Sequence, residues 1–427
     1  MLRSLSLIAL LAAPAAAQDL RLPESAIPGA PGVFGGRRGN FGQPQRQPQP
    51  QPQAAAVANP PPRVRIEEVD AAIVRGRAYL ADKGTKYDDA ASYWGDMTYE
   101  NLKNRNAYVA VSALVAEALR GSPVAAEREA AAKASDYVRK RAAEDYPRAE
   151  GGVLFSPYRM SYGLMELLSQ EKSPERDAQV KRLLEEISTI TVLPQGLRYS
   201  TGECSGQDDA NFQLALLSLA VSKAQAAGFK VPKVGAGETA RDLNVALAQR
   251  MGAANGYYTG SKTASEVNRA GRSPLCELAR LEAGCEGGGP KALRAAQDNF
   301  TARTPELVNL QKFGDQFWSV QDCKGRTVST PHNPGNEQLA TYFVLFGFYW
   351  QAKSLAKSGP LEAEDSYHRL GAALVKMQSA DGWWEDNPTY AGKSYGTASA
   401  VVTLLEVRAG LERAKAEREK AQPPTGP

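Results

Sequence analysis

The chain has 427 residues, of which 43% are hydrophobic and 23% are charged. This is an ordinary composition for one large or two medium globular domains, and it excludes collagen-like, coiled-coil and wholly disordered chains. The formal net charge is only +4 and the two signs are interspersed, so we expect no nucleic-acid partner. His332 and His368 are the two histidines, too few for a site of several histidines, and we expect neither a metal nor a cofactor.

Residues 1–17 have the features of a secretory signal peptide. Arg3 supplies a positive charge, an apolar stretch follows, and residues 15–17 are an Ala-Ala-Ala sequence that fits an A-x-A cleavage site. We therefore expect the mature protein to be soluble and exported, either to the periplasm or out of the cell. No Cys follows the cleavage site and no later run of about 18 apolar residues is present, so no lipid anchor or transmembrane segment is expected.

Residues 18–63 are rich in Pro, Gln, Gly and Ala and contain almost no large apolar side chains. Such a segment buries too little apolar surface to fold, so the sequence predicts a disordered, extended linker. A passive tether is favoured over a strip that docks another protein. At the other end, residues 411–427 are expected to form a charged C-terminal tail that continues a helix and ends in Pro-Pro-Thr-Gly-Pro.

Residues 64–410 alternate two kinds of helical segment, and the second kind recurs about every 50 to 65 residues. These second helices are expected to begin near Asn106, Met160, Asn211, Pro274, Leu339 and Ser394. Strand signals are nearly absent. The pattern predicts an all-α domain of about six helical hairpins.

Several loops before the second helices contain a turn and an aromatic pair, such as Tyr93-Trp94 and Trp383-Trp384. Their recurrence with the repeat is compatible with a structural lock between hairpins. The simpler alternative is that these side chains fill the space between helix pairs.

The last repeat carries a resemblance to a known superfamily. The string from Gln378 through Gly382 to Trp384, followed by Tyr395-Gly396-Thr397, resembles the Q-x-x-x-G-x-W repeat of squalene/hopene cyclases and protein prenyltransferase β-subunits. Membership in this superfamily of terpenoid cyclases implies an (α/α)6 toroid, in which two concentric rings of helices surround a central cavity. The resemblance concerns the fold more than the activity.

In such a toroid the second helices all begin at one mouth of the cavity, which selects candidate site residues. Catalytic candidates there are Asp208, Asp209 and Glu337. Ligand-binding candidates are Trp94, Arg105, Tyr158, Arg159, Asn211, Arg272, Cys276, His332, Trp384, Lys393 and Tyr395. Free backbone N–H groups at helix N-termini favour an anionic ligand. Alternatively, these acids and amides cap helices and the arginines pair with carboxylates.

Complete catalytic signatures of the superfamily are missing from the sequence. Where the resemblance implies the D-x-C element of a zinc prenyltransferase, Pro274 stands in place of the Asp before Cys276, and the last second helix offers no His. The D-x-D-D acid of class II terpene cyclases does not occur. Cys204-Ser205-Gly206-Gln207 has the Cys-to-Gln spacing of thioester proteins, whose string is C-G-E-Q, but not the residues between.

The four cysteines, Cys204, Cys276, Cys285 and Cys323, are more simply explained by oxidation in an exported protein. Three pairings of two disulfides are open. Cys276 and Cys285 are close in sequence and are candidates to staple a helix end to the next loop.

These observations favour an exported, noncatalytic toroid that binds a small hydrophobic or anionic molecule, or a segment of an envelope protein, in its cavity. The alternative is an enzyme with an unrecognised cavity site that acts on an isoprenoid-like or polysaccharide substrate, cyclase- or transferase-like in the first case and lyase- or hydrolase-like in the second. Polysaccharide lyases and glycosidases that are built on helical toroids use paired carboxylates or a Tyr or Arg base. Whether the protein is an enzyme stays open at this stage.

Overall fold

The computed structural model describes residues 62–95, 105–144, 156–191, 211–251, 269–310, 317–321, 327–331, 344–385 and 392–421. The chain divides into two units, Met1–Ala58 and Asn59–Pro427, and all described residues lie in the second. The expected signal peptide and nearly all of the expected linker lie outside the described residues.

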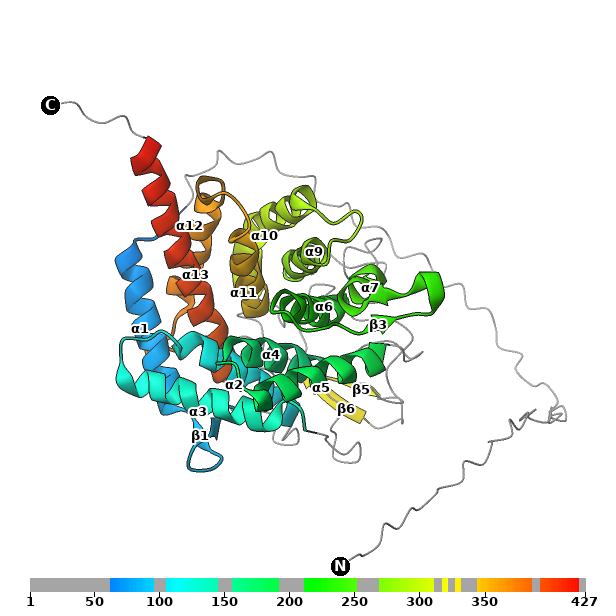
Figure 1. The fold of residues 1–427 in the computed structure, drawn as a ribbon. Coiled ribbons are helices and arrows are strands. Elements are labelled where there is room, and N and C mark those ends of the chain that lie inside the picture. Colours follow the sequence, from blue (N-terminus) through cyan, green and yellow to red (C-terminus); the bar gives the residue numbers. More distant parts are fainter. Residues whose placement is uncertain are drawn as a thin grey trace, which may run out of the picture. The chain divides into compact units, whose positions relative to one another are not determined.

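The second unit is built from two sets of helices that alternate along the chain (Figure 1). The first set is α1 Ile66–Asp82, α3 Ala125–Arg141, α5 Pro174–Thr191, α7 Leu243–Arg250, α10 Pro290–Leu310 and α12 Pro360–Met377. The second set is α2 Arg105–Leu119, α4 Ser156–Ser169, α6 Asn211–Ala226, α9 Ser273–Glu282, α11 Val344–Leu355 and α13 Gly392–Ala421. The starts expected for five of the second helices agree with these bounds to within a few residues, whereas the start expected near Leu339 lies outside the described residues.

The second set forms a closed inner ring. Helix α2 packs on α4, α4 on α6, α6 on α9, α9 on α11, α11 on α13, and α13 returns to α2. The first set surrounds it: α3 packs on α2, α5 on α4, α7 on α6, α10 on α9, and both α1 and α12 on α13. Figure 1 shows the blue α1 beside the red α13, so the first and last described helices are neighbours. The predicted all-α toroid of helical hairpins is confirmed.

Sequence determines which ring a helix joins. Helix α11 buries 11 of its 12 residues, and its sequence VLFGFYWQAKSL is apolar on nearly every side. Helix α5 instead buries one stripe that includes Val180, Leu183, Leu184 and Ile187, while its other face is charged. A helix apolar all round needs neighbours on every side, whereas an amphipathic helix covers a core and faces water.

Two repeats contain the same tryptophan lock. In the first, the Trp94 indole N–H donates to the carbonyl oxygen of Leu80 in α1 at 2.9 Å, and the Trp94 backbone N–H donates to Ser112 Oγ in α2 at 3.1 Å. The loop aromatic therefore ties an outer helix to the inner helix that follows it. It also leaves no room beside Gly84, where an added Cβ atom would lie 2.7 Å from the Trp94 ring.

The last repeat has the matching lock. The Trp384 indole N–H donates to the Leu374 carbonyl in α12 at 2.8 Å, and the Trp384 backbone N–H donates to Thr397 Oγ1 in α13 at 3.0 Å. Both tryptophans are buried, with 1% of Trp94 and 0% of Trp384 exposed. The locking and space-filling roles considered for these aromatics are thus performed by the same side chains.

Strands are few and short among the described residues. Antiparallel pairs join β1 Thr85–Lys86 to β2 Ser92–Tyr93, and β3 Lys233–Val234 to β4 Arg241–Asp242. The longest pair joins β5 Phe317–Gln321 to β6 Thr327–Pro331, with Phe317 opposite Pro331. The sequence reading did not anticipate this last hairpin.

Helix α13 runs without interruption to Ala421, through the boundary expected at residue 410. Leu411 and Ala414 are still buried on it, and Gly410 lies against the Tyr367 ring of α12. Beyond Ala414 its residues are exposed. No helix in the described ranges combines the length and apolar character needed to cross a membrane.

Candidate functional site

Aromatic side chains of α11 fill much of the interior of the inner ring, where they pack against aromatics of α4 and α6. Phe346 packs edge-on against Phe212 of α6, with ring centroids 6.2 Å apart, and Trp350 lies 6.5 Å from Tyr162 of α4. Helix α11 is separated from α6 by α9 in the ring, so these contacts reach across the interior rather than along it. Trp350 is only 1% exposed. The aromatic stretch of α11 is therefore part of the core, and Trp350 fills space inside the ring.

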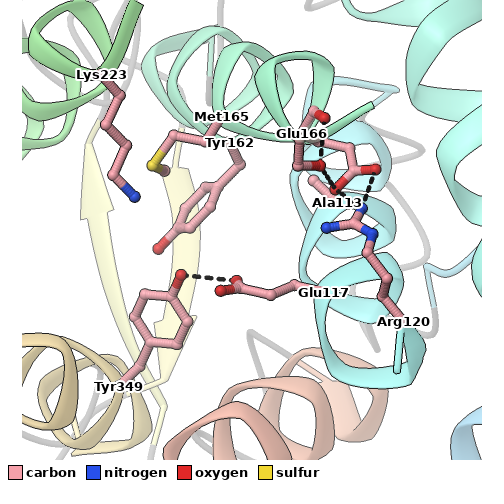
Figure 2. Close-up of a pocket in the computed structure, with 9 residues that line it drawn as sticks. Ala113, Glu117, Arg120, Tyr162, Met165, Glu166, Lys223 and Tyr349 are labelled. Atoms are coloured by element: carbon pink, nitrogen blue, oxygen red, sulfur yellow. Dashed lines mark hydrogen bonds and ion pairs between the residues drawn. The ribbon is translucent and has the colours of Figure 1, made fainter. Parts of the chain in front are cut away.

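A pocket of about 130 Å³ remains beside this core, and we call it the inner pocket (Figure 2). It is lined by residues of α2, α4, α6 and α11 and the turn after α2: Ala113, Glu117, Arg120, Tyr162, Met165, Glu166, Ser169, Lys223 and Tyr349. Glu117 and Lys223 are near the last residues of their helices and Ser169 is the last residue of α4. The inner pocket thus lies toward the C-terminal ends of the inner helices, away from the helix N-termini that the sequence reading favoured.

One side of the inner pocket is an ion-pair network. Lys353 Nζ lies 2.8 Å from Glu117 Oε1 and 2.8 Å from Glu406 Oε1, and the Tyr349 hydroxyl donates to Glu117 Oε2 at 2.8 Å. Burial by itself would raise the pKa of Glu117, but Lys353 and the hydrogen bonds hold that pKa below its usual value. Although burial opposes it, the two carboxylates raise the pKa of Lys353. Both groups are therefore held in their charged forms.

A second pair lies on the other side. Arg120 Nη2 contacts the two carboxylate oxygens of Glu166 at 2.5 and 2.6 Å, and Ser135 Oγ donates to Glu166 Oε1 at 2.7 Å. The Glu166 side chain is 3% exposed and that of Arg120 is 42% exposed. Burial holds the pKa of Glu166 above its usual value despite Arg120. The Glu166 carboxylate lines the inner pocket and is engaged there by Arg120 and Ser135.

The remaining walls are aromatic and aliphatic, with one cation. The Tyr162 and Tyr349 rings meet edge to face at 6.4 Å, and Figure 2 shows the Lys223 ammonium pointing toward the Tyr162 hydroxyl, with Met165 beside it. Burial raises the pKa of both tyrosines, so they stay neutral. Lys223 is exposed at the rim, and within the described residues no hydrogen bond or ion pair holds its ammonium.

The structure places several sequence candidates in structural roles. Arg159 is 3% exposed, and its guanidinium bonds the Ala142 carbonyl and pairs with Glu186 of α5. Arg272 is 1% exposed and lies over the Phe212 ring at 6.0 Å. Trp94 and Trp384 form the locks described above.

Other candidates lie on the inner helices. Tyr158 stacks on Tyr162 with ring centroids 6.4 Å apart and an 8° interplanar angle, which brings it near the inner pocket without lining it. Asn211 is the first residue of α6 and is buried. Lys393 lies over the Trp383 ring at 4.1 Å, and Tyr395 is half-buried on α13.

Five candidates fall partly or wholly outside the described residues: Asp208, Asp209, His332 and Glu337, together with the side chain of Arg105. Their expected roles stay predictions.

Cys276 and Cys285 are both free thiols, so the disulfide considered between them is not formed. Cys276 is fully buried on α9, and burial raises the pKa of its thiol. Cys285 Sγ lies 3.9 Å from the Val245 carbonyl. Cys204 and Cys323 lie outside the described residues. In the described ranges no three His, Cys, Asp or Glu side chains are grouped to hold a metal ion.

The sequence reading missed the charged members of the site. They are Glu117, Arg120, Glu166, Lys223, Lys353 and Glu406. A signal for most of them exists: four apolar inner helices, α2, α4, α6 and α11, each carry one such residue near the C-terminal end, as Glu117 does in SALVAEAL. A single charge near the end of an otherwise apolar helix needs a partner when it is buried, so each of these residues is a candidate for pairing, although the sequence does not identify the partner.

Neither a family model nor a curated protein matches the sequence. Among solved structures, the chain is similar to a type II terpene cyclase. The apo form of that enzyme, MstE from Scytonema, is 13% identical with a TM-score of 0.48 over 82% of this chain and 100% of that chain. A variant of MstE in complex with geranylgeranyl dihydroxybenzoate (substrate) is 12% identical with a TM-score of 0.45, over 81% of this chain and 99% of that chain. The ring arrangement described above stands on the helix contacts of this chain alone.

Proposed function

We propose that the protein is a noncatalytic binder of a small molecule that has a carboxylate and an apolar body, held in the inner pocket. The observation that carries this proposal is Lys223. The carboxylates of Glu117 and Glu166 each have a cationic partner. The Lys223 ammonium faces the pocket, and no carboxylate in the described residues forms an ion pair with it. A ligand carboxylate would pair with the Lys223 ammonium and accept a hydrogen bond from the Tyr162 hydroxyl. Met165 and the tyrosine rings would contact the apolar body of the ligand.

Size supports a small ligand. Pockets for drug-sized molecules usually have volumes of about 300 to 1,000 Å³. The inner pocket has about 130 Å³, because the aromatic core takes up the adjoining space. A single ring with a carboxylate suits such a volume better than a long isoprenoid chain.

The titratable groups favour binding over proton transfer. A general acid or base works best when its pKa lies near the working pH. Here the pKa of Glu117 is lowered by Lys353 against the effect of burial, while burial raises those of Tyr162 and Tyr349. Each of these shifts moves the pKa of the group further from pH 7. Burial shifts two groups the other way, raising the pKa of Glu166 and lowering that of Lys223. Glu166 is engaged by Arg120 and Ser135, and a ligand carboxylate would favour the charged form of Lys223.

The inner pocket lies near the C-terminal ends of the inner helices, so its preference for an anionic ligand depends on Lys223. The C-terminal end of a helix carries a partial negative charge, which disfavours a nearby anion. Preference for a carboxylate therefore rests on Lys223 rather than on the helix ends.

Benzoate is a suitable probe, with benzyl alcohol as its uncharged counterpart, and isothermal titration of the whole mature protein gives both affinities. We expect benzoate to bind more tightly than benzyl alcohol, and Lys223→Met to remove that difference, a loss of about tenfold or more for benzoate. Lys376→Met, at an exposed lysine of α12, is the matched control and should change neither affinity. Equal binding of benzoate by the Lys223→Met protein would refute the proposal.

Export is the second part of the proposal, and it is supported by the sequence of residues 1–17. We propose that the mature chain begins at Gln18, with residues 18–63 as a tether to the toroid. Intact-mass measurement of the protein secreted or released from its native cells tests this. A mass that includes Met1 to Ala17 would contradict cleavage.

A further inference from the structure

A second pocket, of about 240 Å³, lies where the loop from α4 to α5 meets the end of α6. Its described lining consists of Lys172, Arg176, Asp177, Lys181, Ala227, Gly228, Phe229 and Lys230, and we call it the basic pocket. No residue is shared with the inner pocket. Among these described lining residues, four side chains are cationic and one is a carboxylate.

Arg176 forms the floor of the basic pocket. Its side chain is only 3% exposed, although it belongs to the amphipathic helix α5. The guanidinium carbon lies 5.6 Å from the centre of the Phe229 ring, within the range of a cation–π contact. The backbone N–H of Arg176 donates to Ser173 Oγ at 3.1 Å, so the start of α5 is also held in place.

The Arg176 guanidinium and the Asp177 carboxylate beside it are incompletely hydrogen-bonded within the described residues, since Arg176 Nε and Asp177 Oδ1 are both buried without a hydrogen-bond partner. These two atoms lie 3.6 Å apart, which is an ion-pair distance but too long for a hydrogen bond. Buried donors without partners are rare in folded proteins, and an unseen ligand is one of their recognised causes.

The rim adds positive charges that form no ion pair with another described residue. Lys172, Lys181 and Lys230 are all exposed around the buried guanidinium. They come from three segments: the loop before α5, α5 itself and the chain after α6. Surface lysines alone would indicate only a solvated face, but here they surround a fixed arginine at the bottom of a pocket. A planar guanidinium with several ammonium groups is the combination that recognises a tetrahedral dianion.

We propose that the basic pocket binds a phosphate group, either free phosphate or a phosphate monoester such as a lipid head group. The phosphate oxygens would accept hydrogen bonds from the Arg176 guanidinium and ion pairs from the rim lysines. Asp177 offsets one of the four cations, so a dianion is matched better than a monoanion.

The first experiment is isothermal titration of inorganic phosphate into the whole mature protein at constant ionic strength. We expect saturable binding, with affinity reduced about tenfold or more by Arg176→Gln. Because a buried substitution can impair folding, the second variant is Lys181→Met with Lys230→Met, at exposed positions, for which we expect a loss of severalfold. Lys376→Met, at an exposed lysine of α12 outside both pockets, is the control and should bind phosphate as the natural protein does.

Vesicles separate the two sources of phosphate. Co-sedimentation with vesicles containing phosphatidic acid, compared with vesicles of phosphatidylcholine alone, is expected to depend on Arg176, Lys181 and Lys230 if a lipid head group is the ligand. Binding of inorganic phosphate without vesicle binding assigns a free phosphate or a soluble ester. Absence of both, or binding that all the variants retain, overturns the proposal. Since Lys223 is not part of this site, failure here leaves the proposed carboxylate site untouched.

Discussion

Lys353 of α11 and Glu117 of α2 form an ion pair at 2.8 Å between two inner helices that are not neighbours in the ring. Helix α13 lies between them and contributes Glu406 to the same ammonium. The pair therefore spans the interior of the toroid near the C-terminal ends of its inner helices. Its side chains are partly exposed, 22% for Lys353 and 32% for Glu117, so the inner pocket admits some solvent.

Breaking this pair should destabilise the protein. Glu117→Gln leaves Lys353 with Glu406 alone, and Lys353→Met leaves the partly buried carboxylates of Glu117 and Glu406 without their shared cation. We expect each substitution to lower the free energy of unfolding by about 1 to 3 kcal/mol. Urea unfolding followed by circular dichroism gives these values. Arg408→Gln, which removes exposed pairs with Asp70 at 3.0 Å and with Glu412 at 3.3 Å, is the matched control and should cost less than about 1 kcal/mol. A double variant whose loss equals the sum of the single losses would show that Glu117 and Lys353 are not coupled.

The same pair predicts how stability depends on pH. The pKa of Glu117 is lower in the folded protein, because Lys353 and Tyr349 outweigh its burial, so its contribution is full above its unfolded pKa and is lost as pH falls through the folded pKa. The pKa of Lys353 is raised, so its contribution is full below the unfolded value and is lost as pH rises through the folded one. The natural protein should therefore exceed Glu117→Gln in stability at neutral pH, with the difference shrinking below about pH 4. A constant difference from acid to neutral pH would contradict this assignment.

The two tryptophan locks should be equivalent. Trp94→Phe and Trp384→Phe each remove a buried indole hydrogen bond to a helix carbonyl, which keeps only its backbone bond from Lys83 or Gln378, so we expect each to lower the free energy of unfolding by about 1 to 3 kcal/mol. Trp383→Phe, at a half-buried neighbour, is the control and should have a smaller effect. Denaturant titration of the three variants measures this. If Trp383→Phe proved as costly as Trp384→Phe, loss of ring volume rather than the lock would be responsible.

Close packing of α12 on α13 depends on Gly410. A Cβ atom there would lie 2.3 Å from the Tyr367 ring, so Gly410→Ala should lower the melting temperature and cost about 1 to 3 kcal/mol. Tyr367→Leu, combined with Gly410→Ala, should recover part of that loss by removing the obstructing ring. Gly289→Ala is the matched control, because nothing lies within 4 Å of its added Cβ atom. Scanning calorimetry of the variants compares them, and an unchanged melting temperature for Gly410→Ala would contradict the close approach.

The sequence was sufficient for the fold because the fold depends on periodic patterns. Apolar runs such as that of α11 and the stripe of α5 distinguish inner from outer helices, and the Trp383-Trp384 loop indicates the repeat that the structure shows as a lock. Spacing along the chain is enough for these inferences, since helix periodicity is local.

Sequence reasoning did not find the inner pocket, because its members come from four helices and meet only through ring closure. Glu117 and Lys353 are 236 residues apart, and nothing local to either indicates the other. The local rules for anion binding instead favour helix N-termini, which lie at the other end of the inner helices. Arg159 is an example. It lies near the N-terminus of an inner helix, where an arginine could bind an anionic ligand, but its guanidinium donates to the Ala142 carbonyl and the Glu186 carboxylate.

Return of α13 to α2 leaves the inner ring without a first or last member. In an open array of helical hairpins, a terminal repeat has one neighbour and can detach or be added while the rest stays folded. Here every inner helix has two inner neighbours, so loss of one hairpin would expose apolar surface on both sides of the gap. The number of hairpins is therefore fixed by closure, and the described helices should unfold as one cooperative unit rather than from an end.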